Sequence, residues 1–396
     1  MPIDPVDLKR EAERFLRSFS EERLVRYLER LERGGESRIE SYYLDRGEHC
    51  GVFVQVGSSR ARISILRQIE RLGVKVLPLG EALERVPEAR GSCWRLVDYR
   101  ESFYTALVAA YGNNAGLFVH VPRDVRITIP LMSCFLLPES NRVQLIHNVI
   151  ILEPGAELCI VKGCMAVPKA ENVAHISVEE VYVGPGARLH VVMLHSWNRT
   201  SEVRSLTVAK LEQDSMLNTL YFTHTPVKES EVVTKAALER NAQATLSTVV
   251  VGRGEGRYLI RDEAKLVGDS SSAMIVSRAA AFERCEIDSV SRIEAYSRGS
   301  RGHIECTAVP FSDAAKIKTT PELAAFTEDV QLSHEAAIGK LSEEELTYLM
   351  LKGLSEEEAK SLLVLGLLRV EMPSMPDSIK ALVDRTVREV FKRVSM

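Results

Sequence analysis

The middle of the chain, from about Val143 to Ile317, consists of apolar segments in which every second residue is hydrophobic. Clear examples are ELCIVKG, RLHVVML, MLNTLYF and TLSTVVV. A period of two is typical of β-strands that bury one face, and this part of the chain carries no comparable helical period. We therefore expect a mainly β core.

Short turns separate these strands and recur roughly 27 to 31 residues apart. The turns are Pro154-Gly155-Ala156, Pro185-Gly186-Ala187, Gln213-Asp214-Ser215, Asn241-Ala242, Asp269-Ser270 and Gly299-Ser300. Such spacing is typical of a solenoid, whereas a sandwich or barrel needs no constant period and a propeller blade is longer, about 40 residues. The pattern favours a right-handed parallel β-helix with two or three short strands per turn. Chance repetition in a β-rich region is the alternative.

The amino-terminal part has a mixed pattern. Residues 4–33 have helical spacing, with Ser20 as an internal N-cap. The segments GVFVQVG and VKVLPL are strand-like, and a short helix is predicted between them for residues 63–72. These segments predict an α/β appendage of residues 1–100, followed by a β-helix core of residues 101–320.

The carboxy-terminal part, residues 321–396, is predicted to be a helical domain. Ser342 and Ser355 each precede three glutamates, which is the capping-box pattern at the start of a helix. A last amphipathic helix is predicted from Asp377 to Val394. These helices either pack against the solenoid or present a groove to another protein.

Composition narrows the class of protein. A formal net charge of −4 on 396 residues, with basic residues scattered among acids, argues against a nucleic-acid partner. The chain has no apolar run long enough to span a bilayer and no signal-like start, so we expect a cytoplasmic protein without a membrane partner. Seven cysteines without a CxxC pair argue against a disulfide framework and a zinc ribbon.

Candidate metal chemistry is concentrated near the end of the β region. Cys306 lies in GHIECTAV, on the same face of the predicted strand as Ile304, and His334-Glu335 follows about one solenoid turn later. Thiolate, imidazole and carboxylate together are a plausible ligand set for iron or a nascent cluster. The simpler interpretations are a buried core thiol and an ordinary surface pair. In a strand His334 and Glu335 would point to opposite faces, and in a turn both could reach one centre.

Two further cysteines differ by five positions. Cys159 and Cys164 therefore belong on opposite faces of a regular strand, which makes a joint chelate unfavourable. The glycine-rich segment GRGEG lacks the Lys-Ser/Thr of a P-loop, so the chain supplies no ATPase machinery of its own.

Several segments carry recognisable motifs. GCMAVP resembles a Gly-Cys-Thr-Ala-Pro motif, and MLHSW resembles a Thr-x-Gln-Asn-Trp segment. SLTVAK resembles a strand that ends in lysine, and RGHIEC resembles a Gly-x-x-x-Cys-Asp motif, with Thr307 in place of the aspartate. SHEAAIGKLSEEELTYLMLKGLSEEEAKSLLVLGLL resembles a closing block in which Lys352 stands in place of an arginine. In this order, from about Val143 to Arg369, the segments resemble the SufB/SufD family of iron–sulfur cluster assembly scaffolds.

The resemblance implies a scaffold rather than an enzyme. It implies that Cys306, His334 and Glu335 assemble a transient Fe–S cluster, the cysteine of one subunit facing the histidine of another. It also implies a sulfur path inside the coil, for which Cys164, His195, Trp197 and Lys210 are the matching positions.

The implied partners are a SufC-type ABC ATPase docked on the carboxy-terminal helices, a sulfur donor of the cysteine desulfurase system, and a second SufB/SufD-type subunit. Because the chain carries both cysteine and histidine, a homodimer would build two equivalent sites. A heterodimer with a paralogue is the other arrangement.

Two departures from the family pattern bear on this interpretation. The amino-terminal cysteine motif of many SufB proteins is absent, and His195 stands where glutamine is usual. The alternative function is a SufD-like subunit that stabilises the complex and docks the ATPase without holding a cluster. A carbohydrate-acting β-helix enzyme is a third possibility, and it predicts a secretion signal and an acidic groove.

Overall fold

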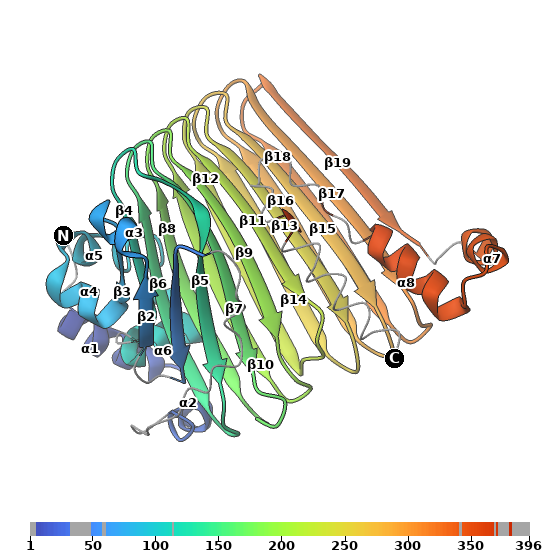
Figure 1. Ribbon diagram of the computed structural model, residues 1–396, viewed down its shortest axis with the longest axis horizontal. Coiled ribbons are helices and arrows are strands. Elements are labelled where there is room, and N and C mark those ends of the chain that lie inside the picture. Colours follow the sequence, from blue (N-terminus) through green and yellow to red (C-terminus); the bar gives the residue numbers. More distant parts are fainter. Residues whose placement is uncertain are drawn as a thin grey trace.

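The computed structural model is a parallel β-solenoid of about eight turns with helices near both ends (Figure 1). Each turn gives one strand to a ten-stranded sheet and one to a nine-stranded sheet, and the main hydrophobic core lies between them. The structure describes residues 5–31, 49–57, 61–112, 115–339, 343–367, 370 and 380–381. The predicted mainly β class and solenoid architecture are confirmed.

The ten-stranded sheet has the order β19-β17-β15-β13-β11-β9-β7-β5-β1-β2, and the nine-stranded sheet has the order β18-β16-β14-β12-β10-β8-β6-β4-β3. The strands of the first are β1 (Gly51–Val56), β2 (Ala61–Ile65), β5 (Arg126–Leu137), β7 (Glu157–Ala166), β9 (Arg188–Ser196), β11 (Met216–Thr223), β13 (Gln243–Gly252), β15 (Ser272–Ala281), β17 (Ser300–Pro310) and β19 (Val330–Ile338). The strands of the second are β3 (Lys75–Pro78), β4 (Leu117–Val121), β6 (Val143–Leu152), β8 (Ala174–Val183), β10 (Glu202–Leu211), β12 (Glu229–Leu238), β14 (Arg257–Leu266), β16 (Glu286–Ala295) and β18 (Lys316–Ala325).

The register of the strands confirms the predicted repeat. Successive in-register positions of the ten-stranded sheet are Glu157, Arg188, Met216, Gln243, Ser272, Arg301 and Gln331. One turn of the solenoid therefore takes 27 to 31 residues. Because every turn restores the same register, a residue type that recurs at this spacing forms a continuous row along the sheet.

The six predicted turns each contain one residue with positive φ. These residues are Gly155, Gly186, Asp214, Asn241, Ser270 and Gly299. The N–H of Gly155 donates to the carbonyl of Pro185 at 2.9 Å, and the N–H of Gly186 donates to that of Gln213 at 2.9 Å, so the turns are hydrogen-bonded from coil to coil. Glycine, asparagine and aspartate tolerate this conformation best, which explains most of the turn composition.

The amino-terminal residues begin the two sheets. β1 pairs in parallel with β5, and β3 pairs antiparallel with β4, so this region is continuous with the solenoid rather than an appendage to it. The helix predicted for residues 63–72 is partly wrong, because Ala61–Ile65 form β2 and pair antiparallel with β1. Ile63 and Ile65 alternate with exposed residues, and pairing with β1 selects the strand.

Helices cover the nine-stranded sheet at this end (Figure 1). They are α1 (Pro5–Leu16), α2 (Glu21–Leu28), α4 (Leu79–Arg85), α5 (Pro87–Ser92), the 3-10 helix η1 (Tyr99–Glu101) and α6 (Phe103–Tyr111). The short helix α3 (Arg67–Arg71) instead places Ile69 against the main core. α6 packs on the outer faces of β6 and β8, α1 packs against α6, and α4 packs on β4 and β6 beside them. Ser20 accepts a hydrogen bond from the N–H of Arg23 at 3.3 Å, which confirms the predicted N-cap of α2.

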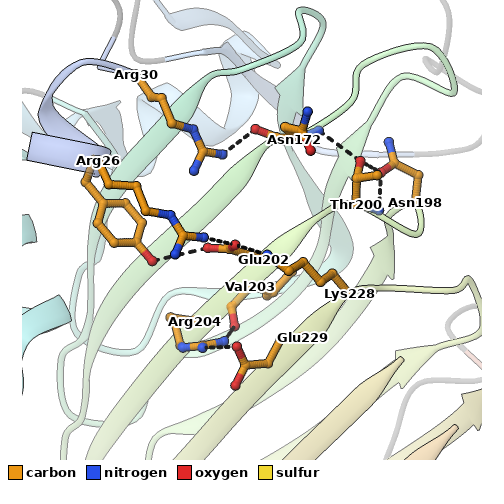
Figure 2. Close-up of polar contacts among 11 residues, drawn as sticks. Arg26, Arg30, Asn172, Asn198, Thr200, Glu202, Val203, Arg204, Lys228 and Glu229 are labelled. Atoms are coloured by element: carbon orange, nitrogen blue, oxygen red, sulfur yellow. Dashed lines mark hydrogen bonds and ion pairs between the residues drawn. The ribbon is translucent and has the colours of Figure 1, made fainter. Parts of the chain in front are cut away.

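One buried carboxylate connects α2 to the solenoid. Glu202, at the start of β10, contacts Arg26 of α2, and it accepts hydrogen bonds from Lys228 at 2.8 Å and from the Tyr27 hydroxyl at 3.2 Å (Figure 2). Arg30 donates to the backbone carbonyl of Asn172 in a neighbouring turn. These contacts fix the helical cover to the coils beneath it.

Among the described residues, fewer helices lie at the opposite end of the solenoid. The helical pattern expected directly after Pro321 is wrong, because β18 and β19 continue the two sheets to Ile338. The helices that follow are α7 (Glu343–Leu351) and α8 (Glu356–Leu367). Ser355 and Glu358 exchange the two hydrogen bonds of a capping box, as predicted. Ser342 and nearly all of the helix predicted from Asp377 to Val394 lie outside the described residues.

Val364 of α8 packs in a hydrophobic cluster on the outer face of the ten-stranded sheet. Among the described residues, no helix is both long and apolar enough to cross a membrane.

Candidate functional site

The interior of the solenoid contains two rows of polar or sulfur-bearing side chains among otherwise apolar rows. In the ten-stranded sheet, the in-register row is Lys162, Met193, Tyr221, Thr248, Ser277 and Cys306. In the nine-stranded sheet, it is Asn148, Glu179, Thr207, Thr234, Asp262 and Ser291. We call these two rows the polar ladders. Most rows beside them carry Val, Ile, Leu and Ala.

Side chains of the two ladders meet across the interior. Lys162 forms an ion pair with Glu179, and both are buried. Thr248 donates a hydrogen bond to Asp262 at 2.8 Å, and Cys306 Sγ lies 4.0 Å from Ser291 Oγ. The ladders therefore form one polar strip that runs from Lys162 to Cys306 through the interior.

The strip contains a small cavity. A space of about 40 Å³ is lined by residues that include Glu179, Thr207, Tyr221, Thr234 and Thr248. This volume is enough for a water molecule, and the lining supplies hydroxyl and carboxylate partners for it. A polar atom that entered this cavity could thus form hydrogen bonds midway along the strip.

The two charged centres of the strip differ. Glu179 has Lys162 as a counter-ion and accepts a further hydrogen bond from Asn148 at 3.3 Å. Asp262 makes no salt bridge within the described residues, and burial raises its pKa to about 6 although hydrogen bonds from Thr248 and Thr234 oppose the shift. Asp262 is therefore close to half-protonated at a weakly acidic pH.

Cys306 ends the ladder of the ten-stranded sheet. It lies on β17, one strand before the outer edge of β19, which is unpaired within the described residues and which we call the open edge. Its side chain is 2 % exposed and shares the inner face of β17 with Ile304, as predicted. Burial raises the pKa of the Cys306 thiol, against the opposing effects of Ser291 and Arg278. In a single chain the thiol is therefore protonated at neutral pH, and exposure at the open edge would favour the thiolate that metals bind.

His334 and Glu335 lie on β19, the terminal strand, and both are exposed. His334 is in register with Ile304, and Glu335 is in register with Glu305, so they point to opposite faces of the strand. Ala336 is the residue in register with Cys306. His334 thus continues an interior row, and within the described residues no further coil follows it, while Glu335 continues an outer row.

Three of the four predicted path residues lie together in the interior. Cys164 is in register with His195, and its Sγ lies 3.8 Å from Met193 Sδ of the ladder. The ring centroids of His195 and Trp197 are 5.5 Å apart, and Tyr221 Oη lies 3.1 Å from His195 Nδ1. Tyr221 therefore connects these residues to the polar strip.

The environment of this group keeps it uncharged. Burial lowers the pKa of His195 well below its usual value, with a further contribution from His175. Burial also raises the pKa of the Cys164 thiol. At neutral pH the group is a neutral thiol beside a neutral imidazole.

The fourth path residue, Lys210, points to the outer surface. Its ammonium lies 3.1 Å from Glu212 and 3.2 Å from Glu239. Its neighbours Ala209 and Leu211 face the interior, so alternation along β10 places Lys210 on the outside.

Comparison with known proteins now decides the family. Residues 135–367 match the family model "SUF system FeS cluster assembly, SufBD core domain". The chain belongs to the SufB/SufD family. The matched region begins in β5 and ends with α8, so it contains both polar ladders and the open edge. Members of this family take part in iron–sulfur cluster assembly.

Individual relatives agree with the family model. An iron–sulfur cluster assembly SufBD family protein of Archaeoglobus fulgidus is 31 % identical over 87 % of this chain and 91 % of its own length. A SufBD family protein of Methanothermobacter thermautotrophicus (strain Winter) is 30 % identical over 84 % of this chain and 82 % of its own. The iron–sulfur cluster assembly protein SufB of Bacillus subtilis is 24 % identical over 86 % and 73 %.

A periodic signal in the sequence marks the ladder residues of this SufBD core, although the predictions from motifs missed it. Lys162 lies two positions before Cys164 and thus on the same face of β7, and Thr248, Ser277 and Cys306 follow one another at the spacing of the turns. A search for polar residues at that period would have found the ladder of the ten-stranded sheet. The facing ladder needs the structure, because sequence does not say which rows of two sheets oppose each other.

The predicted metal ligands do not form a preassembled group in one SufBD chain. Within the described residues, three potential ligand atoms come within 4.8 Å of one another only at Cys93, His147 and Glu180. Cys306, His334 and Glu335 are not such a group, since His334 and Glu335 leave β19 on opposite faces. A site that uses them needs a second surface against the open edge.

Proposed function

We propose that this SufB/SufD-family chain is a scaffold that receives sulfur and iron and builds a nascent Fe–S cluster where the open edge of its solenoid meets a second subunit. One observation carries this proposal. The polar strip leads to Cys306, one strand from an edge that is unpaired within the described residues and that presents His334. The cluster is the cargo of the scaffold, and its type is left open.

Cys306 and His334 are the principal ligands in this proposal. Both belong to inward-facing rows at the last two strands of the ten-stranded sheet, so a subunit that covers this end would approach both. Thiolate and imidazole suit iron, and the covering subunit would exclude water from the cluster. Glu335, on the outer face of β19, would serve as a ligand from the rim of the interface.

The second subunit is a copy of this chain or a paralogue. β18 and β19 end the two sheets and leave their outer edges unpaired within the described residues. An unpaired edge is a template for association. A homodimer built there would place the cysteine of each copy opposite the histidine of the other, which gives two equivalent sites.

The carboxy-terminal helices are the proposed dock for a SufC-type ABC ATPase. Tyr348, Met350, Leu351 and Leu362 of α7 and α8 are exposed, and Leu351 is 82 % exposed. Clustered apolar side chains on short helices are typical of protein-binding surfaces. ATP hydrolysis in the partner would move these helices and open the neighbouring edge, where Cys306 could then ionise.

Sulfur from a cysteine desulfurase system would enter near Cys164. From there Cys164, His195, Trp197 and Tyr221 lead to the polar strip, and the strip leads to Cys306. Lys210 is on the outer surface, so we propose Lys162 as the lysine of the route. Its ammonium, next to Glu179, would stabilise a persulfide anion.

Anaerobic reconstitution with iron and sulfide tests the proposal. The wild-type chain, alone and with its co-purified ATPase, should acquire visible absorption from a cluster, and Cys306→Ala should abolish it. Cys159→Ala is the matched control, because Cys159 is equally buried but lies on the outer face of β7.

Unchanged iron and sulfide content in Cys306→Ala would refute the assignment of this ligand. A wild-type chain that binds the ATPase but never acquires iron would instead support the SufD-like role.

A further inference from the structure

A second group of reactive side chains lies on the outer face of the nine-stranded sheet, beneath the amino-terminal helices. Cys93 directly follows α5, His147 comes from β6 and Glu180 from β8. Cys93 Sγ lies 3.4 Å from His147 Nδ1, and Glu180 Oε2 lies 2.9 Å from His147 Nε2. His147 and Glu180 are fully buried, whereas Cys93 is partly exposed.

Glu180 is held rigidly by backbone donors. The N–H groups of Trp94, Arg95 and Leu96 donate to its carboxylate at 2.5, 2.6 and 2.6 Å, and that of Val97 donates at 3.3 Å. With these donors and His147, the carboxylate oxygens have no free direction for a metal ion. The three side chains therefore form a hydrogen-bonded chain from thiol to imidazole to carboxylate, and not a chelate.

A chain of this kind activates a nucleophile. A cysteine is activated when an imidazole contacts the sulfur and a third group orients the ring. Burial alone would lower the pKa of His147, but Cys93 and Glu180 together raise it to about 10. The imidazole therefore remains protonated at neutral pH, next to the sulfur. The other groups that face this site are Tyr182, which donates to the carbonyl of Ser92 at 2.5 Å, and Arg95.

The remaining six cysteines lack such a partner arrangement. Burial raises the pKa of the thiols of Cys50, Cys134, Cys159, Cys164, Cys285 and Cys306. Cys93 is thus the cysteine whose surroundings favour nucleophilic reactivity in the resting chain.

We propose that Cys93 is a thiolate, paired with the His147 imidazolium and oriented through Glu180, that accepts sulfane sulfur from a persulfide. The choice of persulfide as the co-substrate rests on the proposed role in sulfur handling, whereas the reactive thiolate does not. The Cys93 thiolate attacks the outer sulfur of R–S–SH, a new S–S bond forms as the old one breaks, and the proton goes to the leaving thiolate. The products are R–SH and Cys93–S–S⁻, with the anion facing His147.

Alkylation kinetics test the thiolate without any variant. Each cysteine of the folded chain is quantified by mass spectrometry after short pulses of iodoacetamide between pH 6 and 8. We expect Cys93 to react fastest and its rate to change less than about threefold, since the ion pair is already formed. An ordinary thiol would slow down roughly 80-fold from pH 8 to pH 6. That steep profile, or protection of Cys93 at every pH, would overturn the proposal.

The His147→Gln variant tests the positioning role. It should give Cys93 the steep profile of an ordinary thiol while the other cysteines keep their rates, which also shows that the fold is retained. If His147→Gln does not fold, the pH dependence of Cys93 alkylation in the wild type tests the thiolate without the variant. An unchanged Cys93 profile in a folded His147→Gln chain would contradict the pairing.

Persulfide transfer tests the co-substrate. After incubation with cysteine persulfide, a persulfide on Cys93 should form in the wild type and in Cys306→Ala, and should be absent in Cys93→Ala. A thiolate that alkylates fast but never becomes a persulfide would overturn the sulfur step alone. If Cys306→Ala loses cluster assembly but still forms the persulfide on Cys93, the Cys93 site acts independently of the proposed cluster site.

Discussion

The two ends of the solenoid differ in how far their terminal coils are shielded from water. Every β-solenoid has two terminal coils whose interior rows and backbone edges would face water. At the amino-terminal end, Ile69 of α3 packs against the main core, and the other helices cover the outer face of the nine-stranded sheet, where they contact buried carboxylates on β8 and β10. At the carboxy-terminal end, β18 and β19 carry interior rows to an edge where His334 and Ala336 are exposed.

Because the two ends differ, we expect changes at the covered end to affect the stability of the chain and changes at the open end to affect its association with other subunits. The covered end contains charges that have lost their hydration and depend on specific partners, so changes there should reduce the free energy of unfolding. The open end contains side chains with few partners, so changes there should leave folding intact and alter what binds. Three of the four predictions below test this division, and the one on Asp262 tests the interior between the two ends; they follow in order of decreasing effect on stability.

The largest effect is expected for Glu180→Ala. It removes an acceptor shared by four backbone N–H groups and His147, so the buried N–H groups lose their carboxylate and the His147 ring keeps only its contact with Cys93. We expect a loss of about 3 to 5 kcal/mol in the free energy of unfolding, measured by urea denaturation. Glu335→Ala at the open end is the control, with a change below about 0.5 kcal/mol. Equal losses at the two positions would contradict the division.

Asp262→Asn should stabilise the chain at pH 7 by about 3 kcal/mol, because the charged form of Asp262 is unfavourable in the interior. Its folded pKa of about 6 lies above its ordinary value of 3.8, so the folded state binds the proton more tightly. The stability of the wild type should therefore fall as pH rises from about 4 to 6, and this dependence should vanish in the variant. Asp288→Asn, on the outer face of β16, should keep it.

Glu202→Ala should cost about 1 to 2 kcal/mol, since Arg26, Lys228 and the Tyr27 hydroxyl lose a common partner (Figure 2). Limited proteolysis should cut α2 faster than in the wild type. Glu229→Ala removes a half-exposed partner of Arg204 nearby, and proteolysis at α2 should stay unchanged. Equal cutting in the two variants would show that Glu202 does not hold the helix.

Ala336→Asp should have the smallest effect on stability and a clear effect on association. It places a charge beside Cys306 in the ladder, at the exposed edge. We expect the free energy of unfolding to change by less than about 0.5 kcal/mol, while light scattering shows loss of the proposed homodimer. Ala337→Asp points to the outer face of the same strand and should keep the dimer. A dimer that persists in Ala336→Asp would remove the open edge from the proposed interface.

The repeat made most of the fold predictable. Alternation predicted the solenoid, and the spacing of the chain reversals predicted six of its tight turns between strands. Both were predictable because a parallel coil restores the same environment once per repeat. The pattern was misinterpreted where local preference and tertiary pairing disagree: residues 61–65 become a strand by pairing with β1, and β18 and β19 extend the sheets beyond Pro321.

The site was predictable only in part. Alternation placed Ile304 and Cys306 on one face, and it separates Cys164 from Cys159, but it also puts Lys210 outside and Lys162 inside. The partners that meet between the sheets, such as Lys162 and Glu179, come from different rows of different strands. Sequence periodicity defines each row and contains no information on which rows face each other.

The coil-to-coil turns have a consequence for how such proteins change over generations. Each turn closes on its neighbour through a backbone hydrogen bond and one left-handed residue, so a whole coil is a transferable module. Duplicating or deleting one coil would move the two ends apart or together by about 4.8 Å, the distance between neighbouring strands. The proposed sulfur site at one end and the proposed metal site at the other would each survive such an event, so the distance between them can change in steps of whole coils.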